Sequence, residues 1–176
     1  MLDFTRNHFE LFGLPVRYAI DPAALERAYR ELQRTVHPDR HASAGDAERR
    51  LALQAAARVN EAYRALGDPV ERARYLLTLR GIDAFDESDT SLDPAFLERQ
   101  LERREQASDA AGARDTQALE RLLAEVRDEA AATEAAVAQA LESPPDLACA
   151  RARVRELRFL GKVAEDVDAL LAEVDA

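Results

Sequence analysis

The sequence has few of the residues that build disulfide frameworks, metal centres and aromatic cores. Its 176 residues include no tryptophan, one methionine and a single cysteine, Cys149. One cysteine can form neither a disulfide within the chain nor a cysteine-based zinc site. We therefore expect Cys149 to be a small buried hydrophobic residue in a helix, and we expect no metal and no cofactor.

Long apolar runs are also missing. No stretch approaches the roughly 18 consecutive apolar residues that a membrane span needs. The N-terminal segment contains Asp3 and Glu10 and lacks the apolar core of a secretory signal. No import sequence precedes the first predicted helix. We expect a soluble protein of a reducing compartment without a membrane partner, and a bacterial cytoplasm fits best.

The residue patterns of common enzyme classes are absent as well. There is no glycine-rich phosphate loop, so the chain should not hydrolyse ATP itself. The many carboxylates are spread over helix faces without a nucleophile–base set, so we predict no enzyme and no catalytic residue. His37 and His41 have the spacing of half a metal site, but Pro38 keeps them from sharing a helical face. His8 is expected to be a surface or packing residue.

Charge is distributed unevenly along the chain. The net charge is −10, yet residues 1–76 hold 12 basic against 11 acidic residues. Residues 77–176 hold 12 basic against 23 acidic residues. Because phosphate binding needs clustered cations, the acidic C-terminal half argues against a nucleic-acid partner.

What remains is a chain rich in Ala, Leu, Glu and Arg and poor in Gly and Pro, which predicts an all-α protein. Apolar periodicity and helix end signals place helices near 7–12, at 22–36, 48–66, 69–79, 94–110 and 119–141, and a last helix marked by residues 157–174. Ser143 to Asp146, with two prolines, separates the last two helices. Residues 81–92 are polar and are interpreted as a linker.

The helix at 22–36 carries a basic face. Its apolar face consists of Leu25, Ala28, Tyr29, Leu32 and Val36. On the opposite face, Arg27, Arg30 and Arg34 lie within about 60° of each other. Pro38 forces His37-Pro38-Asp39 into a turn at the end of this helix. The next helix has an apolar face of Leu51, Ala55, Val59, Ala62 and Leu66. The two helices should form an antiparallel hairpin with His-Pro-Asp at its exposed tip.

The C-terminal half predicts a three-helix bundle. Asp93 suits the N-cap of its first helix, and Pro94 suits the first helical position. The apolar residues of the last helix repeat at three- and four-residue spacing, close to a heptad seam. Short connections between the helices favour a bundle.

Leu97, Leu101 and Phe159 have two alternative roles in this bundle. Leu97 and Leu101 share one face of a helix with few large apolar residues, and Phe159 lies about 100° from the apolar seam of the last helix. Geometry alone favours a core role for the two leucines, with Phe159 covering an edge. Exposed large apolar residues can instead mark a partner site.

The N-terminal motifs resemble the J domain, the module by which co-chaperones activate DnaK-type ATPases. Besides His37-Pro38-Asp39, they are Phe9 to Leu14, Tyr29, Asn60 to Tyr63, Asp68-Pro69 and Arg72-Ala73, within roughly residues 4 to 76. The resemblance implies a DnaK-type partner. We expect contacts with that ATPase at His37, Pro38, Asp39, Arg27, Arg30, Arg34 and Arg40.

The chain as a whole resembles the HscB family of co-chaperones in iron–sulfur cluster assembly. The likeness lies in Phe9 to Pro15, His37 to Asp39, Arg74 to Leu77, Phe96-Leu97 through Glu105, and Leu157 to Leu160. In that family the J domain activates the DnaK homologue HscA, and the C-terminal domain binds the scaffold IscU. The resemblance implies scaffold contacts at Leu97, Leu101, Glu102, Arg104, Glu105 and Phe159. Glu98 and Arg103 depart from the pattern, since many members have apolar residues there. The extra N-terminal cysteine motif of the vertebrate type is absent.

We therefore expect a J domain over residues 1–78, a linker over 79–92 and a three-helix scaffold-binding domain over 93–176. The chain would stimulate HscA and deliver IscU to it, aiding iron–sulfur cluster transfer and protein maturation. A general J-domain co-chaperone for DnaK would differ only in the clients of the bundle. A helical scaffold protein or an enzyme would require a coincidental J motif.

Overall fold

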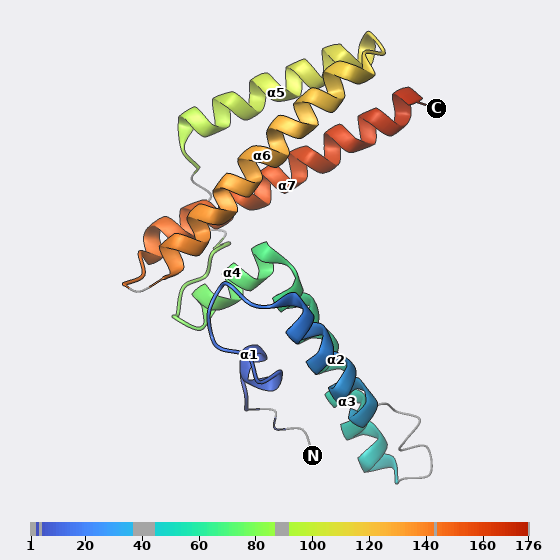
Figure 1. The fold of residues 1–176 in the computed structure, drawn as a ribbon, viewed down its shortest axis with the longest axis vertical. Coiled ribbons are helices and arrows are strands. Elements are labelled where there is room, and N and C mark those ends of the chain that lie inside the picture. The colour runs from blue at the N-terminus through green and yellow to red at the C-terminus, as the bar shows by residue number, and fades with distance from the viewer. Residues whose placement is uncertain (1–2, 4, 37–44, 87–91, 143, 176) are drawn as a thin grey trace. The chain divides into compact units, whose positions relative to one another are not determined.

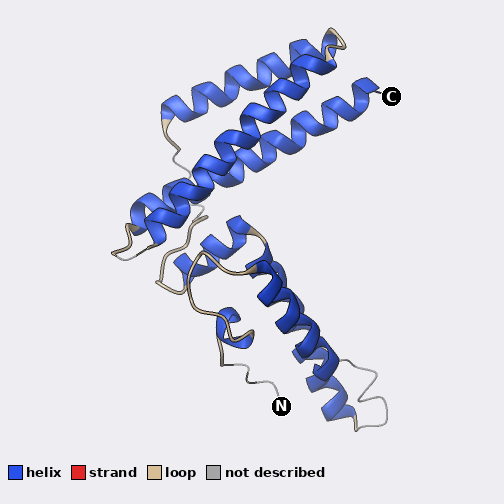
Figure 2. Cartoon of the chain, viewed as in Figure 1, coloured by secondary structure: helices blue, strands red, loops and turns tan. Residues whose placement is uncertain are grey.

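The computed structural model describes residues 3, 5–36, 45–86, 92–142 and 144–175. Over these residues the chain forms seven helices and no strand (Figure 2). The predicted all-α class is therefore confirmed. The chain divides into two compact units, Met1–Leu79 and Arg80–Ala176, which are described one at a time. Residues 87–91 of the predicted linker and Ser143 of the predicted break lie outside the described residues.

The first unit contains α1 (His8–Leu11), α2 (Pro22–Val36), α3 (Asp46–Gly67) and α4 (Pro69–Thr78). Side-chain caps and a proline define several of the helix ends. Asn7 and Glu10 form a capping box around the start of α1. Asp68 accepts a hydrogen bond from the Glu71 backbone N–H at 2.8 Å, and Pro69 occupies the first turn of α4. The predicted helices agree with these bounds to within two residues.

Helices α2 and α3 lie side by side as an antiparallel hairpin (Figure 1). Leu25 of α2 and Val59 and Leu66 of α3 are buried, and the two helices contact each other. Leu51, which the sequence pattern placed on this interface, is instead 41% exposed, and Ala52 is buried. The reason is helical geometry. Counting from Val59 at 100° per residue, Ala52 returns to within about 20° of the interface and Leu51 misses it by about 80°.

The second unit contains α5 (Pro94–Gly112), α6 (Thr116–Leu141) and α7 (Leu147–Asp175). Asp93 accepts a hydrogen bond from the Phe96 backbone N–H at 2.9 Å, with Pro94 in the first turn, as the sequence predicts. The pattern of large apolar residues in α7 starts at Leu157, but the helix itself begins ten residues earlier, at Leu147. Its first turns are capped by Asp146, which accepts from the Cys149 backbone N–H at 3.0 Å.

The core of the second unit is built chiefly by α6 and α7. One cluster contains Leu119, Leu122, Leu123 and Val167 together with two alanines of α5. A second cluster joins Phe96 of α5 to Val126 and Leu160. Phe96 is the single large apolar residue that α5 buries, next to Gln100, Ala107 and Ala110. Hydrophobic burial therefore holds α5 less firmly than it holds α6 and α7.

Residues 83–86, which belong to the predicted linker, contact α7. Arg155 donates a hydrogen bond to the Ala84 carbonyl at 2.7 Å, and Arg151 donates to the Asp83 carbonyl at 3.1 Å. The Arg158 guanidinium lies 4.3 Å from the centre of the Phe85 ring. These contacts join residues 83–86 to the second unit.

Among the helices of the described ranges, none has the length and hydropathy of a membrane-spanning segment.

Candidate functional site

The first candidate surface is the basic face of α2. Arg27, Arg30 and Arg34 are all exposed. Arg27 lies 3.6 Å from a carboxylate oxygen of Asp21, and Arg30 Nε donates to Glu26 at 3.0 Å. Exposed pairs of this kind are worth about 0–1 kcal/mol, so a partner carboxylate can replace them at little cost. The basic face is therefore available for binding an acidic surface.

The hairpin that carries this face is fixed by a polar cluster at the α2–α3 interface. The Tyr29 hydroxyl donates to Asn60 Oδ1 at 3.0 Å, and the Tyr29 ring stacks on Tyr63 with centroids 4.0 Å apart. Gln33 donates to the same Asn60 oxygen and, at 3.1 Å, to the Tyr29 hydroxyl. Tyr29, Asn60 and Tyr63 were singled out as J-domain motif residues from the sequence. Gln33 was not, although it lies one turn after Tyr29.

A second contact holds α1 against α4. The His8 ring stacks on the Tyr75 ring with centroids 4.0 Å apart, and the Tyr75 hydroxyl accepts from the His8 backbone N–H at 3.0 Å. His8 is buried, so it is a packing residue. Burial lowers the pKa of His8, and the positive charge of Arg58 lowers it further.

Four of the residues that we expect to contact the ATPase follow α2 directly in the sequence. His37, Pro38, Asp39 and Arg40 lie outside the described residues. Their role in contacting the ATPase stays a prediction from the sequence. The described end of α2, Val36, is buried.

The second candidate surface lies on α5 and α7. Leu97 is 41% exposed, Leu101 60% and Phe159 36%, so the two leucines are not core residues. Phe96, about 100° around α5 from Leu97, takes the core position instead. The Phe96 ring also meets Phe159 edge-on with centroids 5.7 Å apart, which brings Phe159 next to α5. The other predicted scaffold contacts, Glu102, Arg104 and Glu105, are exposed on α5.

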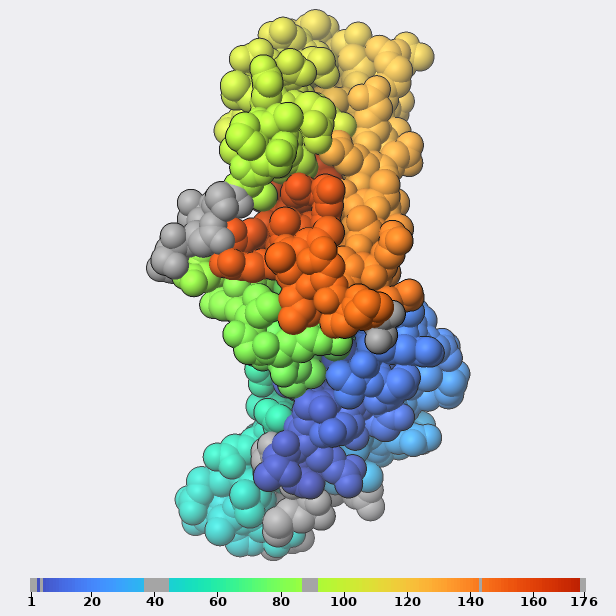
Figure 3. Space-filling model, turned by 90° about the vertical axis from the view of Figure 1, so that its left-hand side faces the viewer, coloured from blue at the N-terminus to red at the C-terminus, as the bar shows by residue number. Residues whose placement is uncertain are grey.

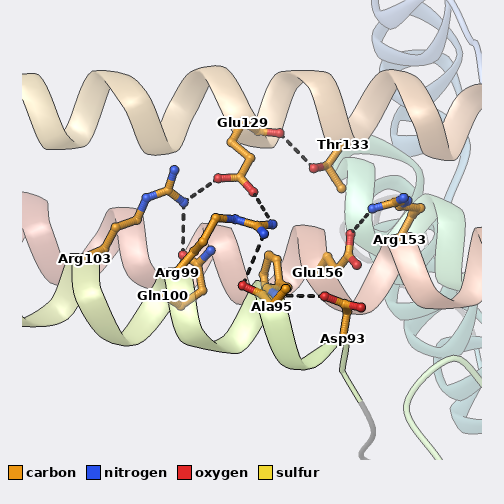
Figure 4. A network of polar contacts seen from close by, with 10 residues as sticks. Asp93, Ala95, Arg99, Gln100, Arg103, Glu129, Thr133, Arg153 and Glu156 are labelled. Atoms are coloured by element: carbon orange, nitrogen blue, oxygen red, sulfur yellow. Dashed lines mark hydrogen bonds and ion pairs between the residues drawn. The ribbon is translucent and has the colours of Figure 1, made fainter.

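A polar network behind this surface ties α5 to α6 (Figure 4). Glu129 of α6 pairs with Arg103, and its other carboxylate oxygen is 3.6 Å from Arg99. Arg103 also donates to Gln100 Oε1 at 3.2 Å. Arg103, which departs from the family pattern, is thus a largely buried partner of Glu129, and Glu98 is exposed. Sequence reasoning missed Gln100 and Glu129, because no local pattern links residues on separate helices.

Both surfaces are suited to binding rather than to chemistry. In the part of the chain that the structure describes, no group of three or more His, Cys, Asp or Glu side chains is arranged to hold a metal ion. Cys149 is half-buried near the start of α7. Among these residues the features that stand out are therefore a cationic helix face in the first unit and an apolar patch with charged neighbours in the second.

Comparison with known proteins matches both units to described families. Residues 7–75 match the "DnaJ domain" and residues 92–168 match the "HSCB C-terminal oligomerisation domain". The "Co-chaperone protein HscB homolog" of Burkholderia multivorans is 50% identical over 175 residues, covering 99% of both chains. The protein of the same name from Burkholderia mallei is 47% identical with the same coverage.

Solved structures give the same result for the fold. The chaperone HscB from Vibrio cholerae matches with a TM-score of 0.87 at 34% identity, covering 96% of this chain and 99% of that one. The human co-chaperone protein HscB matches with a TM-score of 0.88 at 28% identity, covering 95% of this chain and 83% of that one.

Proposed function

Because this chain belongs to the HscB family of J-domain co-chaperones, we propose that it delivers the iron–sulfur scaffold IscU to the DnaK-type chaperone HscA and stimulates its ATPase. Family membership confirms the resemblance found in the sequence. It also confirms that the chain is a co-chaperone and not an enzyme. A J domain implies a DnaK-type partner. We propose HscA as that partner and IscU as the client.

The observation that carries the proposal is the exposure of Leu97, Leu101 and Phe159. A helix that buries one large apolar residue while exposing two leucines presents an apolar patch on its surface. We take IscU as the partner of these positions because of the resemblance to HscB. Glu102, Arg104 and Glu105 would supply the polar edge of the contact.

The J domain would act through α2 and the His-Pro-Asp turn. The basic face of Arg27, Arg30 and Arg34 would steer the hairpin to an acidic patch on the ATPase and form ion pairs at the edge of the contact, with Arg40. His37, Pro38 and Asp39 would then favour the hydrolysis-competent state of HscA. Such a shift requires that the turn bind this state more tightly than the other.

Carrying both surfaces on one chain would couple delivery to hydrolysis. While the C-terminal domain (93–176) holds IscU, the J domain (1–78) keeps it close to HscA, which raises its effective concentration at the chaperone. The result would be client loading timed with ATP hydrolysis, in support of iron–sulfur cluster transfer and protein maturation. We place this activity in the bacterial cytoplasm, in keeping with the bacterial relatives.

Two measurements test this proposal against a general DnaK co-chaperone. IscU is titrated into the full chain by calorimetry, and ATP turnover by HscA and by DnaK is measured with increasing amounts of the chain. The proposal expects saturable IscU binding and stronger stimulation of HscA than of DnaK. No IscU binding, together with equal stimulation of both ATPases, would point to a general co-chaperone with other clients.

A further inference from the structure

A groove lies between α5 and α7, on the side of the second unit that also exposes Leu97 and Phe159. Figure 3 shows surface of α5 (yellow-green) and of α7 (orange to red) within this unit. Two of the six predicted scaffold contacts, Arg104 and Phe159, line the groove. The further residues that matter for the argument are Gln100 and Ser108 on α5 and Lys162 and Leu170 on α7.

The groove has an apolar floor and an edge with two cations, Arg104 and Lys162, and one acidic residue, Asp166. Its floor contains the buried Ala107 and Val167 and the half-buried Leu170. Its edge carries the exposed Arg104 and Lys162. Lys162 lies 3.1 Å from Asp166 and 3.5 Å from Glu165, but these are exposed pairs that a bound carboxylate can replace. An apolar group with a negative charge beside it fits such a groove.

Charge is segregated across the exposed face of α5. Taking Leu97 as the origin and 100° per residue, Arg104 and Gln100 fall about 20° and 60° to the groove side. Glu105 and Glu98 fall about 80° and 100° to the other side, and Glu102 follows at about 140°. Within the ranges that the structure describes, none of these four charged residues forms an ion pair. The apolar patch therefore separates a basic edge from an acidic edge.

Gln100 adds a hydrogen-bond donor at the groove floor. It is 3% exposed, and its Oε1 accepts from Arg103. Its side-chain nitrogen has no hydrogen-bond partner among the described residues. Buried amide donors are normally paired, so an acceptor oxygen brought by a bound group would be favoured here.

We propose that this groove is the second half of the scaffold-binding surface, and that it receives from IscU an apolar side chain with a carboxylate next to it. The inference rests on the proposed function. The carboxylate pairs with Arg104 and Lys162, while a basic group of IscU faces Glu98, Glu102 and Glu105. This arrangement of opposite charges on either side of the patch fixes the orientation in which the scaffold binds.

The test compares groove variants with matched controls in the full chain, with IscU as the titrant at about 0.05 M and 0.3 M salt. Ser108→Trp fills the groove, and Gln106→Trp places the same side chain on an exposed position about 180° from Leu97. Lys162→Glu reverses charge in the groove, and Arg121→Glu makes the same change at an exposed position of α6. Circular dichroism reports whether each variant is folded.

We expect Ser108→Trp to weaken IscU binding tenfold or more and Gln106→Trp to change it less than twofold. Lys162→Glu should weaken binding at low salt more than at high salt, and clearly more than Arg121→Glu does. If the wild type binds IscU and both groove variants match their controls, the groove is not part of the interface, while the proposed function stands. If the wild type does not bind IscU, both proposals are wrong. Should Ser108→Trp fail to fold, the Lys162 and Arg121 pair decides.

Discussion

At the scale of single residues, His8 links the stability of the J domain to pH. Burial lowers its pKa below the unfolded value of 6.5, so the folded state disfavours the proton. The stabilising effect of neutral His8 is fully present above pH 6.5 and is lost as pH falls from there towards the folded pKa, because the unfolded chain binds the proton first.

We therefore predict that the wild type loses stability between pH 7.5 and 5.5, and that His8→Phe loses less. Phenylalanine keeps the stacking on Tyr75 but cannot be protonated. Urea unfolding of both proteins at the two pH values measures the difference. Equal losses in the two proteins would show that His8 does not contribute to the pH dependence.

Glu129 gives a second prediction at this scale. In its pair with Arg103, the Arg103 side chain is 16% exposed and the Glu129 side chain 25%. In the Arg127–Asp168 pair, both side chains are 62% exposed. Removing one partner of a largely buried pair leaves an uncompensated charge. We expect Glu129→Ala to lower the free energy of unfolding by about 1–3 kcal/mol and Asp168→Ala by about 0.5 kcal/mol or less. Chemical denaturation of the two variants compares them, and equal effects would refute a structural role for the network.

At the scale of helices, the basic face of α2 should govern the rate of association with the ATPase. We predict that Arg30→Glu with Arg34→Glu weakens HscA binding chiefly through a slower association rate, and that wild-type binding weakens with salt. Exposed charges act mainly by steering, and screening sets in beyond about 10 Å at ~0.1 M salt.

The control for this prediction is Arg17→Glu with Arg64→Glu, an equal charge change at exposed positions outside α2. Stopped-flow association at several salt concentrations provides the measurement. Salt-independent wild-type association, or equal slowing in the control, would argue against the basic face.

The helices themselves could largely be predicted from the sequence, because caps and apolar periodicity are local. Asp93-Pro94 and Asp68-Pro69 begin helices where expected. The first ten residues of α7 were missed because alanine and valine pack there in place of large apolar residues, with Ala150 and Val154 buried. The exposure of Leu97 could not be derived from periodicity. It depends on which face of α5 the Phe96 contact and the Glu129 network turn towards α6 and α7.

At the scale of the whole molecule, binding IscU and stimulating HscA should be separable. We predict that Leu97→Ala, Leu101→Ala and Phe159→Ala together remove IscU binding and spare basal stimulation of HscA. Interface anchors typically cost about 2 kcal/mol or more when truncated, and the values do not add. Calorimetry with IscU and circular dichroism of the triple variant check this.

Leu122→Ala is the matched control, because Leu122 is a buried residue of the same domain. Truncating it should cost about 2–5 kcal/mol of stability. The triple variant should keep its helicity and melt close to the wild type. Retained IscU binding in that variant would refute the scaffold assignment. An unfolded bundle would show that the three residues stabilise the domain.

The most direct test of the account is the ATP turnover of HscA, measured with the full chain in its wild-type and His37→Gln forms, with and without IscU. We expect that the wild type stimulates turnover, and that IscU and the chain together stimulate more than either does alone, because tethering raises the effective concentration of the client. His37→Gln should abolish this stimulation without lowering the melting temperature, since the sequence predicts an exposed turn at His37 and a substitution in such a turn usually changes stability by about 0.5 kcal/mol or less. Full stimulation by His37→Gln would contradict the account.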